Sequence, residues 1–149
     1  MDYRRAGLAG LAGTAVMTAL WLIEPKIGLP RLAVGDMLSS LLAVVTAYTS
    51  AGPAVGWVIH FSVGATLALG YAAFFAHRLP GSPVTKGALY GAIIFLLAQL
   101  LFMPLVGAGV FSRGDLRLLL GSLIGHLVYG ALVGAIYGVP KSQGTFAPT

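Results

Sequence analysis

Four long apolar stretches, with no charged residue away from their ends, constrain this chain more than any other feature. They are Ala6–Ile23, Ala54–Ala76, Gly87–Phe111 and Leu116–Val139. At a rise of about 1.5 Å per residue, a helix over each is about long enough to cross a hydrocarbon core of roughly 30 Å. We therefore expect an all-α integral membrane protein, a four-transmembrane-helix bundle that forms a single domain over residues 1–149.

The composition leaves no room for a soluble domain. Hydrophobic residues make up 58% of the chain and charged residues 9%, whereas about a quarter of a soluble domain is charged. The net charge of +5 comes from nine Lys and Arg residues scattered near the ends of the stretches, so we expect the lipid bilayer as partner and no nucleic acid. The absence of cysteine excludes disulfides and thiolate chemistry.

The basic residues also predict an orientation. Four spans place both termini on one side, and that side carries five Lys or Arg residues against four opposite: Arg4, Arg5, Arg78, Lys86 and Lys141 against Lys26, Arg31, Arg113 and Arg117. Because cytoplasmic loops are enriched in Lys and Arg, we expect a multi-pass protein of the inner (cytoplasmic) membrane with both termini in the cytoplasm. The first stretch has no small-residue cleavage site, so we expect it to be retained as a span. We expect residues 141–149 to form a flexible tail.

A fifth apolar segment, about residues 32–50, divides cleanly into two faces. Asp36, Ser39 and Thr46 fall on one side of a helical wheel, and Met37, Leu38 and Leu42 on the other. Such an amphipathic pattern favours an interfacial or re-entrant helix at the outer side, a candidate lid, over a helix surrounded by lipid. The alternative is a fifth span whose small face packs on the bundle.

Pro104 lies inside the third stretch. Proline has no amide proton and clashes with the preceding turn, so we expect it to kink or end that helix and to free carbonyl groups near Gly107.

Small or polar residues recur every four positions in each stretch. Such ridges let helix backbones approach closely in lipid, so we interpret the glycines as helix-packing residues. They are Gly10, Gly56, Gly64, Gly87, Gly91, Gly130, Gly134 and Gly138.

Polar side chains on the same ridges predict an intramembrane site. Counted from the ends of the stretches, His60, His126, Gln99 and Thr18 reach a similar depth in the outer half, and Thr14 lies one turn from Thr18. Polar groups at this depth are costly and mark a functional site by default. The alternative is a structural hydrogen bond, for example His60 to Gln99 or His126 to Thr18. Trp21 and Trp57 are expected in an aromatic belt at the outer interface.

The second and fourth stretches resemble each other. Each has a histidine, a Gly-Ala pair beginning four residues later and a tyrosine eleven residues later, which are His60, Gly64 and Tyr71 in one and His126, Gly130 and Tyr137 in the other. A two-helix unit repeated in parallel accounts for this, with the histidines related by an axis along the membrane normal.

Several short motifs resemble the YagU-like small inner-membrane proteins and related membrane domains of unknown function. The motifs are Trp21-Leu22-Ile23-Glu24-Pro25, Gly56-Trp57-x-x-His60-Phe61-Ser62, Gly87-x-x-x-Gly91, Met103-Pro104-Leu105-Val106-Gly107 and Gly125-His126-x-x-Tyr129. The resemblance implies an inner-membrane protein of about four helices and assigns no activity. The resemblance implies a histidine late in the third span, and this chain has either Gln99 or no counterpart in its place.

Three functions fit these observations. An accessory or scaffold subunit would dock on other membrane subunits, or on a second copy as a homo-oligomer, through its glycine ridges. A proton-sensing or small-solute transport protein would line a pocket with His60 and His126. A b-type haem electron-transfer protein would use the same two histidines as iron ligands, and no other metal site is predicted. The sequence has no hydrolase triad, HExxH or phosphate loop, so we do not expect an enzyme.

Overall fold

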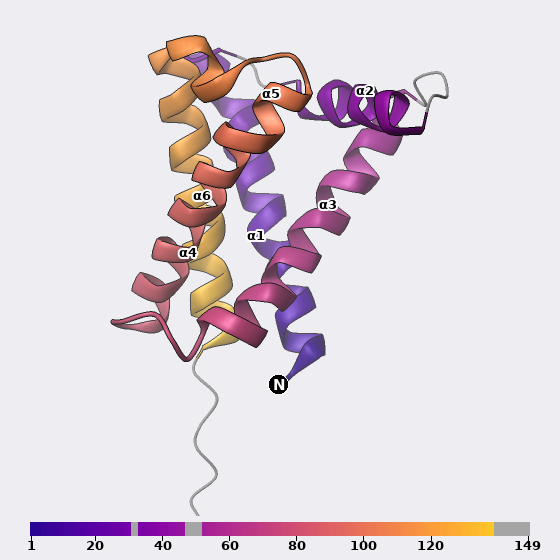
Figure 1. The fold of residues 1–149 in the computed structure, drawn as a ribbon. Coiled ribbons are helices and arrows are strands. Elements are labelled where there is room, and N and C mark those ends of the chain that lie inside the picture. The colour runs from indigo at the N-terminus through magenta and orange to yellow at the C-terminus, as the bar shows by residue number, and fades with distance from the viewer. Residues whose placement is uncertain (31–32, 47–51, 139–149) are drawn as a thin grey trace, which may run out of the picture.

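The computed structural model describes residues 1–30, 33–46 and 52–138, and these residues form helices and connecting turns only. Four helical spans cross the bundle, which confirms the all-α membrane fold and makes this a multi-pass membrane protein (Figure 1). The spans are α1 (Tyr3–Ile23) with η1 (Glu24–Ile27); α3 (Pro53–Gly70) with the π-turn η2 (Tyr71–Phe75); α4 (Pro83–Leu97) with the π-turn η3 (Ala98–Phe102) and α5 (Met103–Leu105); and α6 (Leu116–Tyr137). The tail predicted for residues 141–149 lies outside the described residues.

Polar caps and glycines set the helix ends. Asp2, Ser82 and Asp115 precede α1, α4 and α6, and each side chain accepts hydrogen bonds from backbone N–H groups of the first turn. The third span therefore begins at Pro83, directly after its cap, instead of the predicted Gly87. Gly138, predicted as a packing residue, instead ends α6 with φ of 69°.

The third span also ends earlier than the predicted Phe111, at Leu105. Pro104 cannot donate a hydrogen bond to the preceding turn, and the chain widens into η3 just before it, where the Met103 N–H bonds the Ala98 carbonyl. Gly107 and Gly109 then turn the chain with positive φ angles. The short turn η4 (Val110–Gly114) leads back to α6.

Helix α2 (Val34–Thr46) lies across one end of the bundle, at the end opposite the N-terminus (Figure 1). Its 13 residues are about 20 Å long, too short to cross a bilayer. It is seated on α3, where a side chain at Gly56 would overlap the backbone of Gly35. The segment predicted at about 32–50 is therefore an interfacial helix over Val34–Thr46; residues 32 and 47–50 are not among those described.

Two helix pairs build the bundle. α1 packs on α3, α4 packs on α6, and α1 and α6 join the pairs. In the first pair a Cβ at Gly10 would lie 2.6 Å from the Gly64 carbonyl oxygen. In the second, a Cβ at Gly87 would overlap the Gly130 carbonyl oxygen, and one at Gly91 that of His126. The backbones touch directly at these crossings, and only glycine fits there.

The two pairs are built alike, as the sequence repeat suggests. Gly10 packs on Gly64 and Ala68, which lie four and eight residues after His60. Gly87 packs on Gly130 and Gly134, at the same offsets from His126. The repeat-related tyrosines also meet, because the rings of Tyr71 and Tyr137 lie 6.1 Å apart, edge to face.

Gly91→Ala tests these crossings. Its Cβ would overlap the backbone of α6, so the helices must separate, and we expect a loss of roughly 1–3 kcal/mol in unfolding free energy. Gly7→Ala is the matched control, because a Cβ there meets no atom within 4 Å. Unfolding of both variants in mixed micelles measures the difference. Equal destabilisation by the two substitutions would contradict the direct backbone contact.

Candidate functional site

A cleft opens between α3 and α4 in the half of the bundle nearer α2, and it holds a cavity of about 340 Å³. α3 forms one wall, α4, η3 and α5 form the other, α1 and α6 form the floor, and residues of α2 line the end. Val63, Leu97 and Leu101 at its sides are exposed on the surface of the spans. The mouth of the cleft therefore faces the hydrocarbon of the membrane.

Tyrosines close the cleft toward the N-terminal end of the bundle. The Tyr129 hydroxyl donates to the Gly64 carbonyl at 2.6 Å, and the Tyr90 hydroxyl donates to the Leu67 carbonyl at 2.7 Å. Below them the ring of Tyr71 lies 5.3 Å from that of Tyr90. The cavity is thus open at one side and shut at its deep end.

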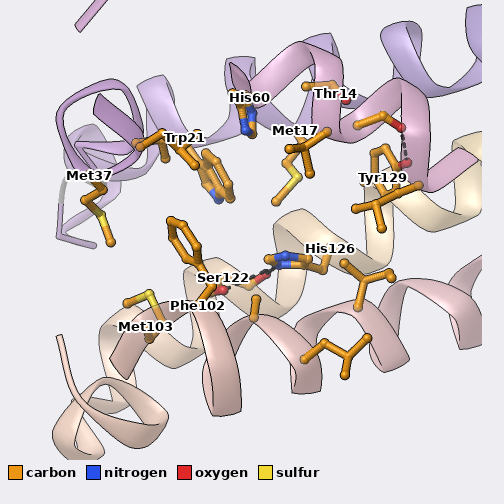
Figure 2. Close-up of a pocket in the computed structure, with 18 of the residues that line it drawn as sticks. Thr14, Met17, Trp21, Met37, His60, Phe102, Met103, Ser122, His126 and Tyr129 are labelled. Atoms are coloured by element: carbon orange, nitrogen blue, oxygen red, sulfur yellow. Dashed lines mark hydrogen bonds between the residues drawn. The ribbon is translucent and has the colours of Figure 1, made fainter. Parts of the chain in front are cut away.

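The lining is apolar apart from a few groups. Trp21 and the two imidazoles face the interior, together with Met17, Met37, Phe102 and Met103 (Figure 2). The polar side chains among the lining residues are Thr14, His60, Ser122, His126 and Tyr129 besides the Trp21 indole. An apolar cavity of this size with a few convergent polar groups is typical of a small-molecule site.

His60 lies on α3 at the upper wall of the cleft in Figure 2. Its Nε2 is 3.3 Å from the Thr18 hydroxyl of α1. Its ring lies 5.5 Å from that of Trp21 and 5.8 Å from that of Trp57, the latter edge to face. His60 is thus held against α1 by one hydrogen bond and by aromatic contacts.

His126 lies on α6 and is 9% exposed. Its Nδ1 is 2.7 Å from the Ser122 carbonyl oxygen, one turn earlier in the helix. A carbonyl oxygen only accepts, so Nδ1 carries the hydrogen and the Nε2 of the neutral ring is an acceptor. The ring lies 6.3 Å from the Trp21 ring and 6.0 Å from the Phe95 ring.

Gln99 stands behind His126 and is fully buried. Its amide donates to the Ser122 hydroxyl at 3.1 Å and accepts from the Ser112 hydroxyl at 3.0 Å. Ser112 lies in η4, so a polar chain runs from this turn through Gln99 and Ser122 to His126. This chain fixes the helix turn that orients the imidazole.

The structure brings the predicted polar residues together but pairs them differently. Thr18 of α1 bonds His60 of α3 and not His126 of α6. Gln99 bonds the two serines and not His60, because α4 packs on α6. Thr14 uses its hydroxyl on the Gly10 carbonyl at 2.8 Å and packs on Gly64.

Ser112 and Trp21 are among the participants that were not predicted from the sequence. Ser112 reaches Gln99 from η4, whose residues 111–113 are left-handed with φ of 46°, 50° and 54°. No pattern in the sequence predicts this left-handed turn. Trp21, expected in an interfacial belt, is only 7% exposed and lies inside the bundle. Its position eleven residues after Gly10, close to three turns, puts it on the packing ridge and is the signal that identifies it.

No group of three His, Cys, Asp or Glu residues suited to a metal ion occurs among residues 1–30, 33–46 and 52–138. His60 and His126 each carry a ring nitrogen of the kind that ligates haem iron.

Comparison with known proteins identifies a family. The chain matches, over residues 1–147, a family of unknown function, DUF6789, and belongs to it. No curated protein and no solved structure matches the chain. The match does not link the chain to the YagU-like proteins that its motifs resemble.

Gln99→Leu tests the polar chain. The substitution leaves the Ser112 and Ser122 hydroxyls without their buried amide partner, so we expect a loss of about 1–3 kcal/mol in unfolding free energy. Leu100→Ala, at the exposed neighbouring position, is the comparison and should cost less. Unfolding in mixed micelles gives both values. A Gln99→Leu protein as stable as the parent would show that the chain of hydrogen bonds contributes nothing.

Proposed function

We propose that this DUF6789 member binds one neutral, lipid-soluble molecule from the bilayer in the cleft between α3 and α4. The observation that carries the proposal is a cavity of about 340 Å³ that combines an apolar lining and a lipid-facing mouth with two histidines inside. A ligand of this kind enters sideways from the membrane, and its polar end meets the imidazoles while its apolar body contacts the walls.

The ligand's polar end is small and uncharged. Counted along the helices, His60 lies about 10 Å from the start of α3 and His126 about 15 Å from the start of α6, well inside the hydrocarbon. The residues that line the cleft include no Lys, Arg, Asp or Glu to compensate a charge. An ionic head group at this depth would be costly, so a phospholipid head group does not suit the cleft.

Binding fits the cleft better than passage through the protein does. A transport route needs an opening toward both ends, but Tyr129 and Tyr90 bond the backbone of α3 at the deep end. Val133, fully buried, lies one turn beyond Tyr129 along α6. The transport hypothesis for His60 and His126 is therefore the weaker proposal.

The haem hypothesis has less support for a different reason. A bis-histidine haem needs both imidazoles directed at one iron with the macrocycle between them. Here the Nε2 of His60 pairs with Thr18, and the Trp21 ring contacts both imidazoles. Both imidazoles would have to leave these contacts to ligate one iron, whereas a lipid-like ligand fits the cleft with the rings in their present positions.

The scaffold hypothesis loses its main argument, because the glycine ridges are used inside the bundle. Gly10, Gly64, Gly87 and Gly130 all pack on neighbouring helices of the same chain. A partner subunit or a second copy would have to dock on the leucine- and valine-rich outer faces instead.

For the location we propose the inner membrane, with the N-terminal end of the bundle in the cytoplasm and α2 at the outer surface. The support is the excess of Lys and Arg residues at the N-terminal end. The cleft then opens within the outer leaflet.

Binding is tested with farnesol, a neutral isoprenoid alcohol, in vesicles that hold the Trp57→Phe protein. Trp21 is then the chain's remaining tryptophan, and it lines the cleft. We expect a saturable change in its emission. Ala98→Phe should lower the affinity at least about tenfold, because a ring on η3 fills the cavity.

Leu100→Phe is the matched control for that variant. Leu100 lies on the same turn but is 46% exposed and is not among the lining residues, so its affinity should equal that of the reference protein. A signal that rises linearly with farnesol, and equally in all three proteins, would be simple partitioning into lipid and would overturn the proposal.

The orientation is tested by single cysteines, which the chain lacks. Lys26 and His77 are exposed at opposite ends of the bundle. In intact spheroplasts, a membrane-impermeant maleimide should label Lys26→Cys, and should label His77→Cys only after permeabilisation. The opposite pattern would invert the proposed orientation, and labelling of both in intact cells would contradict the four-span fold.

A further inference from the structure

Two polar atoms on facing helices of the cleft, the first of them buried, have no hydrogen-bond partner within the described part of the chain. One is the indole Nε1–H of Trp21 on α1, a donor. The other is the Nε2 of His126 on α6, an acceptor that none of the hydrogen bonds of this ring uses. Both residues line the cleft and are more than nine-tenths buried.

The Trp21 N–H faces α6 next to His126. A Cβ built on Gly125 would lie 2.7 Å from the Trp21 Nε1, so the nitrogen edge of the indole rests against the residue that precedes His126. Figure 2 shows the ring on the His126 side of His60, within the cleft. A buried indole N–H normally finds an acceptor, because leaving it unpaired in the interior is unfavourable.

The role of His126 as an acceptor follows from its other nitrogen. Since the Nδ1 hydrogen is donated to the Ser122 carbonyl at 2.7 Å, the neutral ring presents only a lone pair at Nε2. Gln99 and Ser112 support the serine that holds this geometry. The ring is therefore held as an acceptor.

The other polar lining groups are engaged, except for the Nδ1 of His60, which has no hydrogen-bond partner among the described residues. Thr14 bonds the Gly10 carbonyl, Tyr129 bonds the Gly64 carbonyl, and the Ser122 hydroxyl accepts from Gln99. His60 shares its Nε2 with Thr18. The Trp21 donor and the His126 acceptor thus remain as a complementary pair.

We infer that the ligand carries a hydroxyl group, whose oxygen accepts from Trp21 and whose hydrogen is donated to His126. This inference rests on the proposed function and narrows it to lipid alcohols. A carbonyl or an ether accepts from Trp21 but has nothing to donate, and a hydrocarbon does neither. A hydroxyl satisfies both groups with one atom, and it carries no charge into the membrane.

The test compares three probes of matched carbon skeleton on the same protein: farnesol, farnesyl methyl ether and farnesene. Competition against tritiated farnesol in vesicles gives their affinities. We expect farnesol to bind most tightly, the ether about 3- to 10-fold more weakly, and farnesene weaker by a similar further factor. This series uses the unaltered chain, so it does not depend on any variant folding.

Two variants then assign the atoms. His126→Leu should remove the preference for alcohol over ether, while Trp21→Phe should weaken alcohol and ether about equally and leave farnesene unchanged. Farnesol should also move the indole ¹H–¹⁵N signal of Trp21 downfield in the Trp57→Phe protein, and farnesene should not. A structural role alone would not produce this pattern across the three probes.

The outcomes separate the two proposals. Saturable binding of all three probes with equal affinity would overturn the hydroxyl inference and leave the lipid-binding cleft standing, with water satisfying Trp21 and His126. Tighter binding of the ether than of the alcohol would overturn it as well. No saturable binding of any probe would overturn the proposed function itself.

Discussion

The direct contact of helix backbones at glycine is the constraint on which this structure depends. In α1 against α3, and in α4 against α6, the crossing leaves no space for a Cβ at Gly10, Gly87 or Gly91. Lipid supplies no hydrophobic force between helices, so close packing and polar contacts hold each pair. The two pairs meet mainly along α1 and α6, where Gly13 packs on Tyr129 and Gly125 packs on Trp21.

That arrangement creates the cleft. With α1 and α6 in the centre, α3 and α4 stand at the two flanks, and tyrosines bring them together only at the N-terminal end. Toward α2 the π-turn η3 and Pro104 change the course of the third span, and α2 is seated on α3 over the opening. The cavity is thus a consequence of how two similar pairs meet, and it faces the membrane.

Some of the polar groups hold the two histidines in place, and others face the cleft. Gln99, Ser112 and Ser122 are buried and satisfy one another, which holds His126 in one tautomer. In the other pair, the Thr18 hydroxyl lies 3.3 Å from the Nε2 of His60 and holds that ring in place. Polar networks of this kind in a low-dielectric interior are costly unless they are complete. Within the cleft, the Trp21 N–H is a buried donor that lacks a partner among the described residues, and the proposed ligand would satisfy it.

The sequence by itself determined the four spans, the interfacial helix and the ridge residues. The reason is that the length of an apolar stretch and a four-residue spacing are local properties, which decide whether a helix can span the bilayer and which of its faces can pack. It also placed His60, His126, Gln99 and Thr18 at one depth. Only the tertiary structure decided their partners, since pairing depends on which helix faces which. It also decided the burial of Trp21 and the position of Ser112, because a left-handed turn and a cleft between helices arise from packing across the chain and leave no periodic signal within it.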